Sequence, residues 1–151
     1  MGARGSIDSP FPGGEVRVPF LISGWAADSG SKSGSGVDRV LLYDGDRSAV
    51  NLLGTASYSV ARLDVAKFFA NREMLQSGFE FIASSLSLGQ HTLQAWAHST
   101  VMDDWYKVGD LPLTVVAGKG VVRRIPAGAL VAGLGVILSI PLIAAMSKAR
   151  N

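Results

Sequence analysis

One uncharged apolar run, at residues 125–146, constrains this chain more than any other feature; it reads IPAGALVAGLGVILSIPLIAAM. A helix of this length rises about 1.5 Å per residue and spans the roughly 30 Å hydrocarbon core of a bilayer. Arg123 and Arg124 precede the run, and Lys148 and Arg150 follow it, where long cationic side chains reach the lipid headgroups. We therefore predict a single C-terminal transmembrane helix. The alternative, a buried helix of a soluble core, is disfavoured because uncharged apolar runs this long are typical of membrane spans.

Small residues recur along one side of this predicted helix, at Gly128, Ala132, Gly135 and Ser139. In a membrane, small residues at such spacing let a second helix approach closely. We interpret the stripe as a helix-packing surface, with partners among other membrane-protein subunits or further copies of this chain. Membrane lipid is the expected contact of the remaining side of the helix. Ordinary transmembrane composition, which is rich in glycine and alanine, is the alternative explanation.

The apolar run also fixes the expected domain organisation. We expect an extended, Gly-, Pro- and Ser-rich lead-in at 1–14, a folded domain at 15–117, a basic linker at 118–124, the transmembrane helix at 125–146 and a basic tail at 147–151. Residues 1–118 hold nine basic and twelve acidic side chains, so the basic character of the chain belongs to its C-terminal part. A slightly acidic domain without a basic stripe does not predict a nucleic-acid partner.

Short segments of alternating apolar and polar residues fill the region before the linker. Their period of two predicts strands, and turn residues recur about every ten positions. The expected strands cover 16–23, 37–43, 52–58, 79–84, 91–98, 105–108 and 111–116. Residues 62–74 differ, because Val65, Phe68 and Phe69 are spaced as in a helix that Asp64 could cap. The pattern indicates an all-β sandwich of about seven strands with one short helical turn.

Several stretches of this region match a known kind of domain: GSIDSP at 5–10, ISGWAAD at 22–28, VDRVLLYDGD at 37–46, LGTASYSVARLDVAKFF at 53–69, SGFEF at 77–81 and LSLGQHTLQAWAHS at 86–99. Together they resemble a bacterial immunoglobulin-like module of exported and surface proteins. The resemblance implies an immunoglobulin-like β-sandwich, an extracytoplasmic location, and a role as spacer, structural unit or binding platform. Such a fold hosts many unrelated functions, so it does not name one.

The sequence offers little for catalysis or for metal binding. The chain has no cysteine, which excludes disulfides and thiolate metal sites. His91 and His98 fall on one predicted strand about 23 Å apart, too far for one ion. The acidic turns at 44–46 and 103–104 lack the ligand number of a calcium loop. Neither a nucleophile-elbow motif nor a phosphate-binding loop is present. We therefore expect no catalytic residue, cofactor or metal ion.

Three aromatic residues, Trp96, Trp105 and Tyr106, fall late in the domain on two predicted strands. Aromatic side chains on an exposed sheet face favour protein contacts, so these are the candidate contact residues. Packing as ordinary core or cross-strand pairs is the competing interpretation.

We expect a non-enzymatic, single-pass membrane protein that serves as an accessory or structural subunit of a larger membrane assembly, with the sandwich as its docking module. The alternative is a cell-surface adhesin or ligand-binding module anchored by its tail. The orientation is open: the resemblance favours an extracytoplasmic domain, whereas the lack of an apolar signal segment in residues 1–14 favours a cytoplasmic one. The extracytoplasmic side is the preferred expectation.

Overall fold

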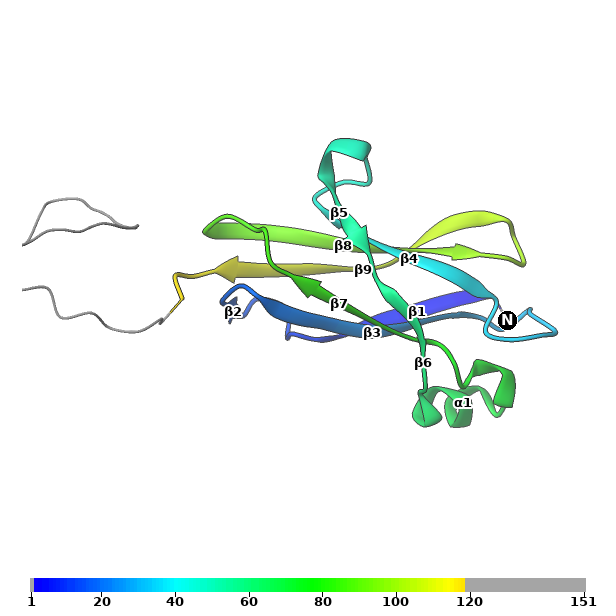
Figure 1. Ribbon diagram of the computed structural model, residues 1–151. Helices are drawn as coiled ribbons and strands as arrows, with labels where there is room; N and C mark the ends of the chain where they lie inside the picture. The colour runs from blue at the N-terminus through cyan, green and yellow to red at the C-terminus, as the bar shows by residue number, and fades with distance from the viewer. Residues whose placement is uncertain (1, 119–151) are drawn as a thin grey trace, which may run out of the picture. The chain divides into compact units, whose positions relative to one another are not determined.

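The computed structural model describes residues 2–118, which form a sandwich of two β-sheets with one short α-helix (Figure 1). The strands are β1 (Ala3–Ser9), β2 (Glu15–Val16), β3 (Phe20–Asp28), β4 (Val37–Asp44), β5 (Leu52–Thr55), β6 (Ser57–Val60), β7 (Gly78–Ala83), β8 (Gly89–Ser99) and β9 (Asp104–Val115). The helix α1 spans Leu63–Phe69, and two 3-10 turns, η1 and η2, span Ala49–Asn51 and Arg72–Met74.

The two sheets of the sandwich differ in size and strand order. One sheet has the order β1-β3-β7-β6 and the other the order β2-β9-β8-β4-β5. Neighbouring strands are antiparallel except for β2, which lies parallel to β9. The first order corresponds to the ABED sheet of an immunoglobulin sandwich, and β9-β8-β4-β5 corresponds to the GFC sheet with one added strand. The predicted β-sandwich is thus confirmed, with nine strands rather than about seven.

The core lies between the sheets and follows from the alternation of the strands. On β8, Leu93, Ala95 and Ala97 are fully buried, as their period of two predicts. They belong to one cluster with Ile22 of β3 and Phe79 of β7, among others. The cluster therefore includes buried side chains from both sheets.

A second, smaller cluster includes Val65 of α1, the helix that lies beside the end of β6 in Figure 1. Val65 and Met74 are buried there, with Trp25 and Phe69 packed against them as an edge-to-face pair. The short helix predicted within 62–74 is confirmed. The predicted cap is wrong: Asp64 lies inside the first turn, and its carboxylate accepts hydrogen bonds from the guanidinium of the preceding arginine.

Four sequence-based boundaries differ from the structure. The strands expected at 105–108 and 111–116 are one continuous strand, β9. Within the segment expected to be a lead-in, residues 3–9 form β1 and pair with β3 in the four-stranded sheet. The strand expected at 16–23 is divided, because the chain leaves β2 in one sheet and starts β3 in the other; Pro19 lies between them and has no N–H for a ladder. The strand expected at 52–58 likewise divides into β5 and β6, which belong to different sheets.

The predicted transmembrane helix at 125–146, its small-residue stripe at Gly128, Ala132, Gly135 and Ser139, and the tail at 147–151 lie outside the described residues, as does the linker beyond Gly118. No helix within residues 2–118 has both the length and the apolar character that a bilayer span requires.

Candidate interaction surface

Two tryptophans and two arginines form a continuous stack on the outer face of the five-stranded sheet. The guanidinium carbon of Arg39 lies 5.0 Å from the ring centroid of Trp105. That of Arg47 lies 4.9 Å from the centroid of Trp96 and 5.7 Å from that of Trp105. These distances are within the range of cation–π attraction. We call this set of four residues the Trp–Arg surface.

The register of three strands explains why these side chains meet. Arg39 of β4 is opposite His98 of β8, and His98 is opposite Trp105 of β9. Trp96 is opposite Lys107 in the next outward-facing row. Arg47 comes instead from the loop between β4 and β5, which Gly45 N–H fastens to the backbone of β8.

A buried glutamine holds the Trp96 ring in place. The indole Nε1–H of Trp96 donates to Oε1 of Gln94 over 2.9 Å. Gln94 is 8% exposed, and its Nε2 donates to Asp46 in the same loop as Arg47, at 3.3 Å. Gln94 therefore joins the loop to the strand and fixes the side chains of the stack in one arrangement.

His98 extends the surface next to Trp105. Its ring centroid lies 5.2 Å from that of Trp105 at an angle of 57°. Its Nδ1 is 2.8 Å from a carboxylate oxygen of Asp38, and its Nε2 is 3.2 Å from one of Asp103. Asp103 adopts a left-handed conformation, with φ of 53°, at the turn between β8 and β9.

Charge on the surface is unevenly compensated. Asp38 and Asp103 face His98, and Asp110 forms an ion pair with Lys107, with 3.2 Å between the Nζ atom and the carboxylate oxygen. Among residues 2–118, by contrast, neither arginine of the Trp–Arg surface has a carboxylate within 4 Å, and neither side chain donates a hydrogen bond. Both arginines are exposed.

The structure brings together two of the three predicted contact residues. Trp96 and Trp105 are partly buried members of the Trp–Arg surface. Tyr106 is elsewhere, because adjacent residues of a strand face opposite sides. Its ring packs against the core, and its hydroxyl donates to the carbonyl oxygens of Arg4 and Ala27, at 2.9 and 3.3 Å. Burial raises the pKa of Tyr106 above its ordinary value. Tyr106 therefore does not belong to the Trp–Arg surface.

Sequence reasoning missed both arginines. Arg39 could have been found, because it precedes the inward-facing Val40 on a strand and must therefore face outward. Arg47 had no such signal, since only the folded loop carries it over the rings of β8 and β9.

A second polar group, Ser87, His91 and Asp44, has the residue types of a hydrolase triad but a different hydrogen-bond pattern. His91 Nδ1 is 2.9 Å from the Asp44 carboxylate, and Ser87 Oγ is 3.5 Å from Nε2. Nε2 is closer, at 2.8 Å, to the Ser87 carbonyl oxygen, which can only accept. Both nitrogens thus act as donors, which suits an imidazolium rather than a general base.

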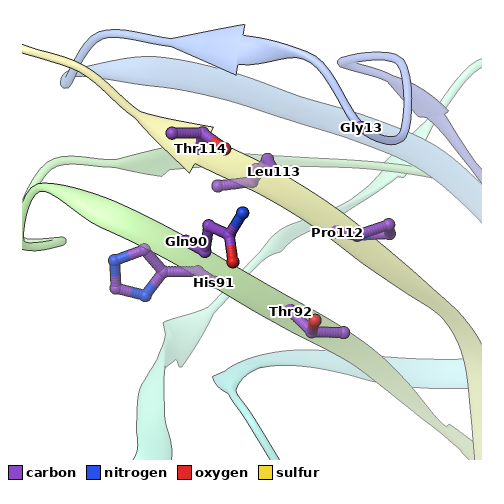
Figure 2. Close-up of a pocket in the computed structure, with 7 residues that line it drawn as sticks. All are labelled: Gly13, Gln90, His91, Thr92, Pro112, Leu113 and Thr114. Carbon is purple, nitrogen blue, oxygen red and sulfur yellow. The ribbon is translucent and has the colours of Figure 1, made fainter.

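The pKa of His91 follows from the same contacts. Burial opposes protonation of the ring, but the hydrogen bonds to Asp44 and to the Ser87 carbonyl outweigh it, and the pKa is raised above its ordinary value. His91 borders a shallow depression of about 330 Å³ between β8, β9 and the turn at Gly13 (Figure 2). Figure 2 shows Gln90, Thr92 and Thr114 along it, without a cluster of convergent charged groups.

Within the described residues, no group of three or more histidine and acidic side chains is placed to hold a metal ion. The acidic turn at 44–46 is occupied by internal contacts: Asp44 faces His91, and Asp46 accepts from Gln94. The Asp44 carboxylate thus holds His91, and the Asp46 carboxylate holds Gln94, the residue that positions Trp96.

Comparisons with known proteins found distant structural similarity and no match by sequence. No protein-family model matches the chain, and no curated protein matches its sequence. Similar solved structures include an endo-β-1,4-mannanase from Thermotoga petrophila, with 13% identity and a TM-score of 0.49 over 78% of this chain and 20% of that chain. They also include CopC from Methylosinus trichosporium OB3b, with 15% identity and a TM-score of 0.42 over 79% of this chain and 100% of that chain. T. fusca AA10A has 15% identity and a TM-score of 0.39 over 71% and 53%. This chain thus spans about a fifth of the mannanase and about half of T. fusca AA10A.

Proposed function

We propose that this chain is a non-catalytic docking module, an accessory or structural subunit of a larger membrane assembly, and that the Trp–Arg surface is where its domain contacts a protein partner. The observation that carries the proposal is the fixed stack of Trp96, Arg47, Trp105 and Arg39 on an exposed sheet face. Tryptophan and arginine are the residues most enriched at the energetic centres of protein interfaces. A stack held from below by Gln94 loses little side-chain entropy on binding.

The membrane part of the proposal rests on the apolar run at 125–146 and its basic flanks. Alkaline carbonate extraction of membranes tests it: the full chain is expected in the pellet, and recovery in the aqueous fraction contradicts the anchor. For the helix-packing stripe, Gly135→Leu should remove co-purifying membrane subunits in mild detergent. If the same partners remain in the same ratio, the stripe has no packing role.

Site-specific photo-crosslinking in source membranes tests the docking surface. A photoreactive amino acid replaces Lys107, which borders the Trp–Arg surface, and in a matched control it replaces Glu80, on the exposed face of the opposite sheet. We expect a discrete adduct from position 107 that is lost with Arg47→Ala, and none from position 80. Equal labelling from both positions, or none from 107, contradicts the docking surface. A chain that is purified from membranes without any subunit supports the adhesin alternative instead.

A further inference from the structure

We infer that the Trp–Arg surface recognises carboxylate side chains on an exposed segment of the partner protein. The inference rests on the proposed function and specifies the chemistry of the partner. It follows from how the two arginines are held, from the charges around them, and from what already covers the tryptophan rings.

The guanidinium groups of both arginines lie over tryptophan rings, and their N–H donors are unpaired within residues 2–118. The attraction of a cation to a ring face does not use the N–H groups of the guanidinium as hydrogen-bond donors. Within residues 2–118, Arg39 and Arg47 donate no side-chain hydrogen bond and form no ion pair. Planar forks of this kind match carboxylates bidentately. The stack thus presents two guanidinium groups whose N–H donors have no partner within residues 2–118.

The same stack disfavours binding of a neutral sugar. A sugar ring that packs on tryptophan needs an open ring face, whereas Trp96 has Arg47 over its ring and Trp105 has Arg39, Arg47 and the His98 ring around it. Both tryptophans are only partly exposed. The surface therefore offers guanidinium edges rather than an aromatic platform.

The surrounding charges favour discrete carboxylates over a polyphosphate. Residues 1–118 carry three more acidic than basic side chains. Asp38, Asp103 and Asp110 lie around the surface, each held by a neighbouring cation or histidine. A nucleic acid or a densely anionic lipid surface would face these carboxylates over a wide area, whereas one or two side chains of a folded partner can fit between them.

Nuclear magnetic resonance of the indole groups tests the inference, because the three tryptophans supply the probe and its control. Trp96 and Trp105 belong to the surface, whereas Trp25 packs beside Phe69 under α1. The full chain, labelled with ¹⁵N-tryptophan in a nonionic detergent, is titrated with the capped peptide GSEGESG. The isosteric peptide GSQGQSG and inorganic phosphate are titrated separately.

We expect saturable shifts of the Trp96 and Trp105 indole signals with the glutamate peptide only, and a fixed Trp25 signal. Arg47→Gln should weaken the affinity about tenfold or more, as for loss of a charge-assisted hydrogen bond. Arg72→Gln, which removes an exposed charge on η2, should leave the affinity unchanged. An unchanged Trp25 signal verifies that each variant is folded.

Three results overturn the inference: no shift with the glutamate peptide, an equal shift with the glutamine peptide, or a shift with phosphate alone, which would indicate a phosphate site. An affinity unchanged by Arg47→Gln also overturns it. Because crosslinking from position 107 is independent of these probes, a discrete adduct without peptide shifts would leave the docking surface standing and reject only its carboxylate specificity.

Discussion

The hydroxyl of Ser99 donates a 2.7 Å hydrogen bond to the carboxylate of Asp28, and both residues are at most 1% exposed. Ser99 ends β8 in the five-stranded sheet and Asp28 ends β3 in the other, so this contact joins the two sheets at one end of the sandwich. Ser99 Oγ also accepts from the N–H groups of Val101 and Met102. One buried serine therefore satisfies both a buried carboxylate and the turn before β9.

Ser99→Ala should destabilise the domain by about 1.5–3 kcal/mol, because it leaves a buried acceptor with one partner fewer and two turn N–H groups unpaired. Urea unfolding of the full chain in a nonionic detergent, followed by far-UV circular dichroism, measures the change. Ser57→Ala, at an exposed position of β6, is the matched control and should change stability by less than about 0.5 kcal/mol. Equal effects of the two substitutions would mean that the buried contact does not join the sheets energetically.

Gly24→Ala should destabilise the domain by about 2 kcal/mol or more. A Cβ at Gly24 would lie 2.1 Å from the backbone oxygen of Ser6 on β1 and 2.8 Å from the Phe79 ring, so backbone must shift. Gly109→Ala is the control, since its Cβ would meet only Ile7, at an ordinary 3.6 Å. Thermal unfolding compares the two. A Gly24→Ala domain as stable as the Gly109→Ala one would refute the close approach of β1 to β3.

His91→Gln should cost more stability at pH 5.5 than at pH 8.5. The pKa of His91 is raised in the folded state, so its contacts with Asp44 and Ser87 stabilise the domain fully below the unfolded pKa of about 6.5 and lose their effect as the pH rises through the folded pKa. Melting temperatures of both proteins at the two pH values measure the difference. A larger loss of stability at pH 8.5 than at pH 5.5 would show that the protonated state assigned to the His91 ring is wrong.

Much of the fold could be predicted from periodicity. The inward side of β8, with Leu93, Ala95 and Ala97, and the amphipathic turn at Val65 follow directly from spacing. Periodicity did not show where the chain changes sheets. Residues 52–60 keep an extended pattern throughout, yet the chain crosses over at Ala56, whose N–H donates to Val40 O. Such crossovers depend on pairing with distant strands, which one segment cannot reveal.

The candidate surface was predictable in part. Composition pointed to Trp96 and Trp105, but it could not separate Trp105 from Tyr106, because one residue of register decides which face of β9 each of these two neighbours occupies. The sequence also did not reveal the hydrogen bonds of the Tyr58 hydroxyl. Tyr58 donates to the carbonyl of Ala26 and contacts Ser35, and burial raises the pKa of Tyr58 to about 12. These partners are more than twenty residues apart in sequence, so only the assembled sandwich brings them together.

Hydroxyl-radical footprinting in source membranes tests the central claim, that the Trp–Arg surface is covered by a partner. Oxidation of each tryptophan is compared between the membrane-bound chain and the chain purified alone in detergent. We predict that Trp96 and Trp105 are protected severalfold in membranes, whereas Trp25, packed beside Phe69, is oxidised equally in both states. Equal oxidation of all three tryptophans in the two states would contradict the account.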